Sequence, residues 1–174
     1  MHDARVRALE PGDAPAVVVL RREALTSSPL AFAASLEDDR ALSIEFVRTA
    51  LADAASSAMF GAFDEAALVG MAGVHLLDKV KLRHKAQLWG MYVAPAARGR
   101  GLGAALVRAV IDHCRSWPGV LQVQLSVTEA AAEASRVYER AGFREWGREP
   151  GGFQWEGRLV DERHLTLILE SAAR

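Results

Sequence analysis

One stretch organises this sequence: Arg98-Gly99-Arg100-Gly101-Leu102-Gly103-Ala104. Its three glycines let the backbone turn sharply and approach a ligand without an intervening Cβ atom. The apolar run of residues 86–93 precedes it, which indicates a buried central strand that Pro95 ends. Apolar residues then recur at three- and four-residue spacing from Leu102 to His113, as on one face of a helix. The sequence therefore predicts a strand, a glycine-rich turn and a helix in that order.

The glycine-rich turn is a candidate binding site for a phosphate-bearing ligand. The first N–H groups of a helix have no intrahelical partner and lie at the positive end of its dipole, so they bind anions. No Lys-Ser or Lys-Thr follows the last glycine, as a nucleotide P-loop requires, and the spacing is not the G-x-G-x-x-G of dinucleotide folds. The spacing is R-x-x-G-x-G/A instead. On this pattern alone, an ordinary tight turn is an equally good interpretation.

A second motif lies at residues 127–143, V-T-E-A-A-A-E-A-S-R-V-Y-E-R-A-G-F. Alternating apolar and polar residues from Leu121 to Thr128 predict a half-buried strand before it. A helix follows, and Gly142 ends it as a C-cap residue. The apolar face of this helix consists of Ala130, Ala134, Val137, Tyr138 and Ala141.

With both motifs in this order, the chain resembles the GNAT superfamily of N-acyltransferases. The first motif resembles the acyl-CoA pyrophosphate loop of that family, and the second resembles its helix with A-x-x-x-Y and a final G-F. The resemblance implies a mixed α/β fold in the order β-α-α-β-β-β-α-β-α-β-β, with a single mixed sheet flanked by helices and splayed central strands. It covers most of the chain, most specifically residues 86–143, and only loosely the first fifty residues.

The remaining patterns agree with that order of elements. A turn at residues 10–13 separates a first strand from a helix that reaches about residue 25, and Ser43 caps a second helix to about residue 54. Two strands at residues 59–63 and 68–77 meet at a tight turn. Two last extended runs, residues 143–147 and 159–169, are joined by a Pro/Gly-rich link at residues 149–152.

Length, composition and charge narrow the class of function. A chain of 174 residues, 51% of them hydrophobic, suits one sizeable core, so we read residues 1–174 as a single N-acetyltransferase domain. A net charge of −1 offers no basic field for nucleic acid or an anionic membrane. The sequence has no apolar run long enough to span a bilayer and no signal peptide, so we expect a cytoplasmic protein. We expect no metal, and a homodimer is possible. The lone Cys114 is predicted to be a structural thiol.

The resemblance implies acetyl-CoA as co-substrate and an amine as acceptor. The main chain at the end of the central strand would pair with the pantetheine arm, and N–H groups of the glycine-rich turn would surround the pyrophosphate. Arg98 and Arg100 would add cationic donors, with a solvated surface charge as the alternative for each. The implied binding residues are Met91, Tyr92, Val93, Arg98, Gly99, Arg100, Gly101, Leu102, Gly103 and Ala104.

The family reaction is direct attack of a neutral amine on the thioester carbonyl, and it implies that Tyr138 protonates the departing sulfur. A core tyrosine with a satisfied hydroxyl is the alternative. Two positions depart from the family pattern, because Ala131 stands where many members carry Asn and Gln87 where many carry Glu. A glutamine cannot be a general base. The sequence therefore does not identify the proton acceptor. The candidates are a chain of water molecules and four side chains: His75, His84, Glu162 and His164.

We predict transfer of an acetyl group from acetyl-CoA to a primary amine of a small molecule or protein. The alternative is a non-catalytic acyl-CoA-binding sensor or scaffold with the same fold. The fold does not name the acceptor. The acidic run Glu37-Asp38-Asp39 would attract a cationic amine, or else be a solvated loop.

Overall fold

Seven strands form one mixed sheet in the order β1-β2-β3-β4-β5-β7-β6. This computed structural model describes residues 5–169, and its chain order is the predicted β-α-α-β-β-β-α-β-α-β-β. The strands are β1 (Arg5–Ala8), β2 (Ser57–Asp64), β3 (Ala67–Leu76), β4 (Lys85–Val93), β5 (Gln122–Thr128), β6 (Arg144–Trp155) and β7 (Arg158–Ile168). The α-helices are α1 (Ala14–Ser27), α2 (Ile44–Ala52), α3 (Leu102–Ser116) and α4 (Ala132–Arg140).

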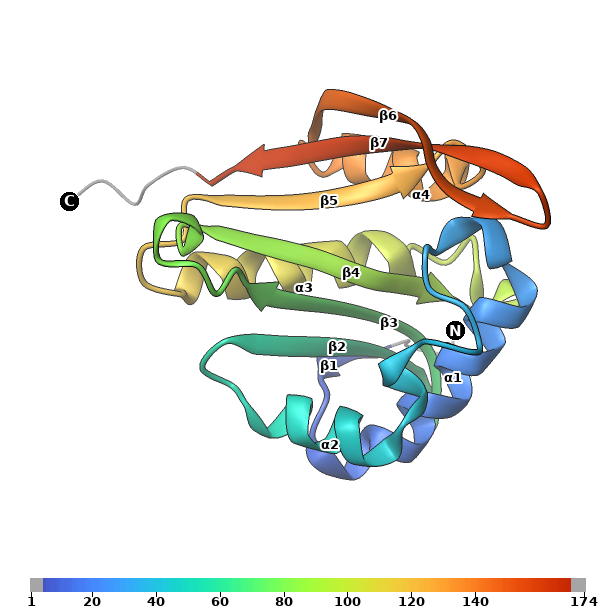
Figure 1. Ribbon diagram of the computed structural model, residues 1–174. Coiled ribbons are helices and arrows are strands. Elements are labelled where there is room, and N and C mark those ends of the chain that lie inside the picture. Colours follow the sequence, from blue (N-terminus) through green and yellow to red (C-terminus); the bar gives the residue numbers. More distant parts are fainter. Residues whose placement is uncertain (1–4, 170–174) are drawn as a thin grey trace.

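Each face of the sheet has its own hydrophobic core. On one face, Leu88 and Val123 of the central strands pack with Leu106 of α3, and Figure 1 shows α3 and α4 on the far side of the sheet. On the other face, Met71 packs with Val17 from α1 and with residues of α2. This second core covers β1 to β4, whereas the near side of β5 and β7 carries no α-helix in Figure 1, within residues 5–169. We call that uncovered side the open face.

The central strands β4 and β5 pair only where they begin. Residues 85–87 pair in parallel with residues 122–124, and beyond them the strands diverge toward their C-terminal ends (Figure 1). Opposite β3, the register of β4 shifts beside Gly90, whose φ is 63°. Such a β-bulge bends a strand locally. The predicted splay is thus confirmed, and "the splay" below means the part of β4 and β5 beyond Gln87 and Gln124.

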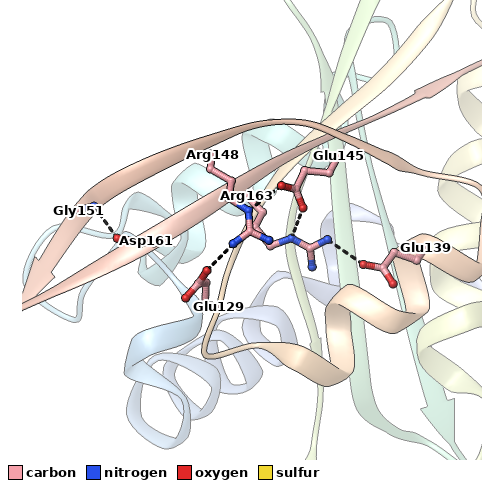
Figure 2. A network of polar contacts seen from close by, with 7 residues as sticks. All are labelled: Glu129, Glu139, Glu145, Arg148, Gly151, Asp161 and Arg163. Carbon is pink, nitrogen blue, oxygen red and sulfur yellow. Dashed lines mark hydrogen bonds and ion pairs between the residues drawn. The ribbon is translucent and has the colours of Figure 1, made fainter.

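The last hairpin differs from the prediction. Residues 149–152 do not link two strands, because β6 continues through them and the turn lies at Glu156 and Gly157. The register with β7 shifts between Glu149 and Phe153, so this Pro/Gly-rich segment is a bulge. Pro150 has no N–H group to donate to another strand. Because β6 lies at the edge of the sheet, the strand can contain this proline within the bulge. The Gly151 N–H donates to Asp161 Oδ1 at 2.8 Å and holds the bulge to β7 (Figure 2).

Five charged side chains connect this hairpin to α4 (Figure 2). Arg163 of β7 donates to Glu139 of α4 at 2.8 Å and to Glu145 of β6 at 2.6 Å. Arg148 of β6 donates to the same Glu145 at 2.7 Å and to Glu129 at 2.8 Å. Single surface pairs contribute little, but a shared network holds each member in one geometry. The network fixes the side of β7 that faces α4 and so orients the residues on the open face.

The thiol of Cys114 lies in the core beneath α3 and is fully buried. Burial raises the pKa of this thiol to about 12. Since the thiolate is the reactive form of cysteine, the prediction of a structural thiol is confirmed. Across residues 5–169, no helix has the length and apolar character needed to cross a membrane.

Candidate functional site

The glycine-rich turn folds into the N-terminus of α3. Gly99 and Gly101 have φ values of 75° and 77°, a left-handed conformation that residues with a side chain rarely adopt. A Cβ atom at either position would meet no atom within 4 Å. The bond from Ala105 N–H to the Gly101 carbonyl, 3.1 Å long, closes the first turn of the helix. The N–H groups of residues 102–104 precede that bond, so they stay available to an anion at this open surface.

Gly103 has a different role in the same turn. A Cβ atom there would lie 3.0 Å from Met91 Cε and 3.7 Å from Val137 Cγ2. The missing side chain therefore lets the start of α3 pack closely on β4 and α4. This contact brings the glycine-rich turn, the splay and the helix of Tyr138 together at one place.

The two arginines of the turn have different surroundings. Arg98 Nε donates to the Val93 carbonyl at 3.0 Å, which holds the guanidinium at the end of β4. Arg100 makes two hydrogen bonds to Asp64, of 2.7 and 3.1 Å, next to the turn between β2 and β3. Arg98 therefore lies beside the splay. Arg100 is held toward another part of the surface by an ion pair, which the sequence did not indicate.

The end of β4 has one paired and one unpaired edge. Met71 and Gly70 of β3 pair with Tyr92 and Val93, whereas β5 pairs with no residue of β4 beyond Gln87 within the described residues. The side chain of Tyr92 points into the core with α1 and α2, where its hydroxyl contacts Ser27 Oγ at 2.8 Å and donates to Glu23 at 3.0 Å. The main chain of residues 91–93 is thus presented to the splay while the Tyr92 side chain is used elsewhere.

Tyr138 lies on the buried face of α4, with 5% of its surface exposed. Its ring contacts Phe143 edge to face at 5.8 Å. Within residues 5–169 its hydroxyl has no hydrogen-bond partner. Burial raises the pKa of this phenol, which keeps it protonated and able to donate. A buried tyrosine normally bonds a protein group, and here that bond is available to a ligand.

On the open face, two glutamines bridge the strands where the splay begins. Gln124 Nε2 donates to Gln87 Oε1 at 2.9 Å across the last pair of β4 and β5. His75 of β3 is the neighbour of Gln87 in register, and burial lowers the pKa of its imidazole. The amide of Gln87 is therefore a fixed bridge between β4 and β5, at the position where many family members carry a glutamate.

The candidate proton acceptors fall into two places. His84 directly precedes β4 at its paired end, away from the splay. His164 lies on the open face, where its Nδ1 is 2.9 Å from Ser126 Oγ and its Nε2 is 3.1 Å from Glu149 Oε2. Sequence reasoning missed Ser126 and Glu149. Alternation in β5 already placed Ser126 on the polar side, but Glu149 lies in the segment that we read as a link between strands.

The acidic run before α2 is not an open patch of three carboxylates. Asp39 forms an ion pair of 2.6 Å with Arg21, and less than a tenth of either side chain is exposed. Asp38 accepts the backbone N–H of Ser35 at 2.8 Å and so shapes its own loop. The prediction that this run attracts a cationic amine is therefore wrong for Asp39, because a buried guanidinium neutralises it.

Residues 21–143 match the sequence model of the acetyltransferase (GNAT) family. The chain belongs to this family. The matched range contains both motifs, from the glycine-rich turn to the C-cap of α4, and with them the splay and Tyr138.

Relatives of known name share parts of this GNAT region. A mycothiol acetyltransferase of Thermobispora bispora is 50% identical over 54 residues, which are 31% of this chain and 18% of that protein. An L-amino acid N-acetyltransferase of Escherichia coli is 27% identical over 101 residues, which are 58% of this chain and 62% of that protein. The chain spans about a fifth or less of the length of the mycothiol acetyltransferases that it matches.

The fold is also that of solved acetyltransferases. A Salmonella typhimurium protein, described as an acetyltransferase and solved with its cofactor acetyl-CoA, superposes with a TM-score of 0.85. The alignment covers 99% of this chain and 97% of that one at 19% sequence identity. The likeness establishes the GNAT fold for the whole described chain.

Proposed function

We propose that this protein transfers an acetyl group from acetyl-CoA to a primary amine of a small molecule or a protein. One observation carries the proposal: the glycine-rich turn at the start of α3 lies beside the splay of β4 and β5. Its left-handed glycines offer backbone N–H groups, and the adjacent edge of β4 pairs with no other strand within residues 5–169. Membership of the GNAT family and the acetyl-CoA in the Salmonella typhimurium structure support this reading.

The residues of the turn and strand fit the two ends of acetyl-CoA. The N–H groups of residues 99–104 would hold the pyrophosphate, because a helix N-terminus favours a negative charge. The unpaired edge of residues 91–93 would hydrogen-bond the amides of the pantetheine arm as an added strand does. Arg98, fixed at the end of β4, would add a charged donor. Arg100 would contribute only by exchanging its bond to Asp64 for the ligand.

Tyr138 would supply the acid of the reaction. Bound acetyl-CoA provides a thioester whose carbonyl carbon accepts an amine. The phenol of Tyr138 stays protonated because burial raises its pKa, and its hydroxyl has no competing partner among the described residues. It can therefore give a proton to the sulfur as the C–S bond breaks.

Ligand-dependent stabilisation and thiol release test this function. Acetyl-CoA and CoA should raise the midpoint of thermal unfolding, and a ligand at about 100 times its Kd stabilises a protein by about 2.7 kcal/mol. ATP and NAD should leave the midpoint unchanged. Acetyl-CoA with a panel of primary amines should release free thiol at a rate that depends on the amine. Stabilisation without thiol release from any amine would instead identify a binding protein, and stabilisation by ATP alone would refute the proposal.

A further inference from the structure

Three polar side chains from three strands form a connected chain on the open face. Ser126 of β5 and His164 of β7 are directly opposite each other in register. Ser126 Oγ lies 2.9 Å from Nδ1 of the imidazole, and Nε2 lies 3.1 Å from Glu149 Oε2 on β6. Ser126 and Glu149 are exposed, so both ends of the chain are accessible. No step of the proposed function above uses these residues.

The direction of the two hydrogen bonds follows from the carboxylate. An ionised Glu149 only accepts, so the imidazole proton lies on Nε2 and points toward it. Nδ1 is then an acceptor, and the hydroxyl of Ser126 donates to it. The lone pairs of Ser126 Oγ remain free to accept a proton from a third group. This is the order of groups in which a hydroxyl passes a proton to a histidine that an acid holds in place.

The chain lies beside the place where acetyl transfer would occur. Ser126 follows Gln124, the last residue of β5 that pairs with β4, by two positions. Residues two apart in a strand share a face, so Ser126 lies on the open face at the edge of the splay. Tyr138 approaches from the opposite face, on α4. A group that accepts a proton and a group that donates one thus lie on the two sides of the splay.

The groups around His164 are two carboxyl side chains, an aromatic ring and a neutral carbonyl. On β6, Glu149 bonds it and the ring of Trp146 stacks at 5.4 Å. On β7 itself, Glu162 is two residues away on the same face and is half-buried, and this burial raises the pKa of its carboxyl. The η2 segment (Pro29–Ala31) presents a neutral group, since the Leu30 carbonyl accepts from Thr128 of β5. Among these groups, Glu149 is in direct hydrogen-bond contact with Nε2, so it orients the imidazole.

We propose that His164, oriented by Glu149 and reached through Ser126, accepts the proton of the incoming amine. The proposal rests on the proposed acetyl transfer and supplies the proton acceptor that Gln87 cannot be. An N–H of the ammonium passes its proton to Ser126 Oγ, while the hydroxyl proton of Ser126 passes to Nδ1. This leaves a neutral amine, an unchanged serine and an imidazolium.

The remaining steps balance with groups already described. The amine nitrogen forms a bond to the carbonyl carbon, and the C–S bond breaks with its electron pair on sulfur. Tyr138 protonates the sulfur, and the second proton that the nitrogen loses restores Tyr138 through water. His164 releases its proton to solvent. The products are one amide, one thiol and one proton for each ammonium consumed.

The pH profile of kcat/KM tests the role of His164. The probe is the panel amine with the highest rate of thiol release, over roughly pH 6 to 10. H164Q should lower kcat/KM by about 10²-fold near pH 7, the usual effect of losing a positioned base. The loss should shrink above the pKa of the amine itself, because a neutral amine needs no acceptor. Stabilisation by acetyl-CoA should not change, and H84Q, at the far end of β4, should match the wild type.

Two further variants separate a proton relay from a structural contact. S126A should reproduce the loss of H164Q because it interrupts the path to Nδ1. E149Q should also lower kcat/KM, because an amide can donate as well as accept and no longer holds the imidazole proton on Nε2. An H164Q profile parallel to that of the wild type at every pH would overturn the proposal.

A measurement without turnover distinguishes this proposal from the proposed function. In ¹⁵N spectra of histidine-labelled protein at alkaline pH, His164 should carry its proton on Nε2, and E149Q should weaken that preference. A proton on Nδ1 would overturn the relay, whatever the activity. Absence of thiol release by the wild type with every amine would contradict acetyl transfer itself, while the tautomer would still decide whether the relay exists.

Discussion

The two faces of the sheet at the splay are built from different parts of the chain. On the side of α3 and α4, the proposed binding groups are backbone N–H groups, shaped by Gly99 and Gly101 within one short segment. On the open face the proposed groups are side chains from separate strands: Ser126 of β5, Glu149 of β6 and His164 of β7. A site made from one local turn depends on glycine spacing alone. A site made from several strands depends on their register, so the two faces should respond differently to mutation.

Charge at the glycine-rich turn should have the largest effect. Gly101→Glu places bulk and a negative charge where the pyrophosphate would lie, so acetyl-CoA should no longer raise the midpoint of thermal unfolding. Gly119→Glu is a matched control, because Gly119 also has a positive φ, of 79°, and open space around its Cβ position. Both variants should lose similar stability, and only Gly119→Glu should keep the response to acetyl-CoA. A response retained by both would remove the turn from the site.

Loss of the phenol should act on turnover and not on binding. Tyr138→Phe keeps the ring that contacts Phe143 and removes only the hydroxyl. We expect kcat to fall by about 10²-fold, the scale for a positioned acid, while the Kd for acetyl-CoA changes little. Stopped-flow thiol release and calorimetric binding measure the two quantities. A full rate of chemistry in Tyr138→Phe would leave this tyrosine with a packing role only.

The two arginines of the turn should differ in their effect on acetyl-CoA binding. Arg98→Gln removes a donor at the end of β4 and should weaken binding about tenfold, the scale of one charge-assisted hydrogen bond. Arg100→Gln should have a smaller effect because Asp64 already binds that guanidinium. Asp64→Asn frees Arg100, and tighter binding in this variant would mean that the ion pair competes with the ligand. Titration calorimetry compares the three variants.

The smallest expected effect concerns stability far from the splay. Burial lowers the pKa of His113, whose ring packs between Phe60 and Trp117. Below the ordinary value of 6.5 the unfolded chain therefore binds more protons at this site, so the free energy of unfolding should fall as the pH drops from 6.5. His113→Phe keeps an aromatic ring and cannot titrate. Urea unfolding at several pH values should show a flatter dependence in this variant than in the wild type.

The sequence predicted the parts of the molecule that short segments determine. The order of elements, the glycine-rich turn before α3 and the cap at Ser43 all follow from local preferences, and Gly142 ends α4 one residue beyond its C-cap Ala141. Features made by distant segments were not predictable. Glu149 reaches His164 only because β6 continues past Pro150 as an edge strand with a bulge. A proline and two glycines indicate a loop, and the pairing with β7 outweighs that preference.

The end of the pairing between β4 and β5 has a further consequence for solubility. Exposed strand edges normally recruit other chains and promote aggregation, so proteins keep them short or covered. Here the unpaired edges lie in the middle of a seven-stranded sheet, held apart by strands that pair for only three residues. A narrow, flexible molecule with amide groups can hydrogen-bond to such an edge. A second polypeptide strand is wider, so the neighbouring strands of the sheet block its approach. The interruption of the sheet would thus offer hydrogen bonds to the proposed ligand and would hinder pairing with a strand of another copy.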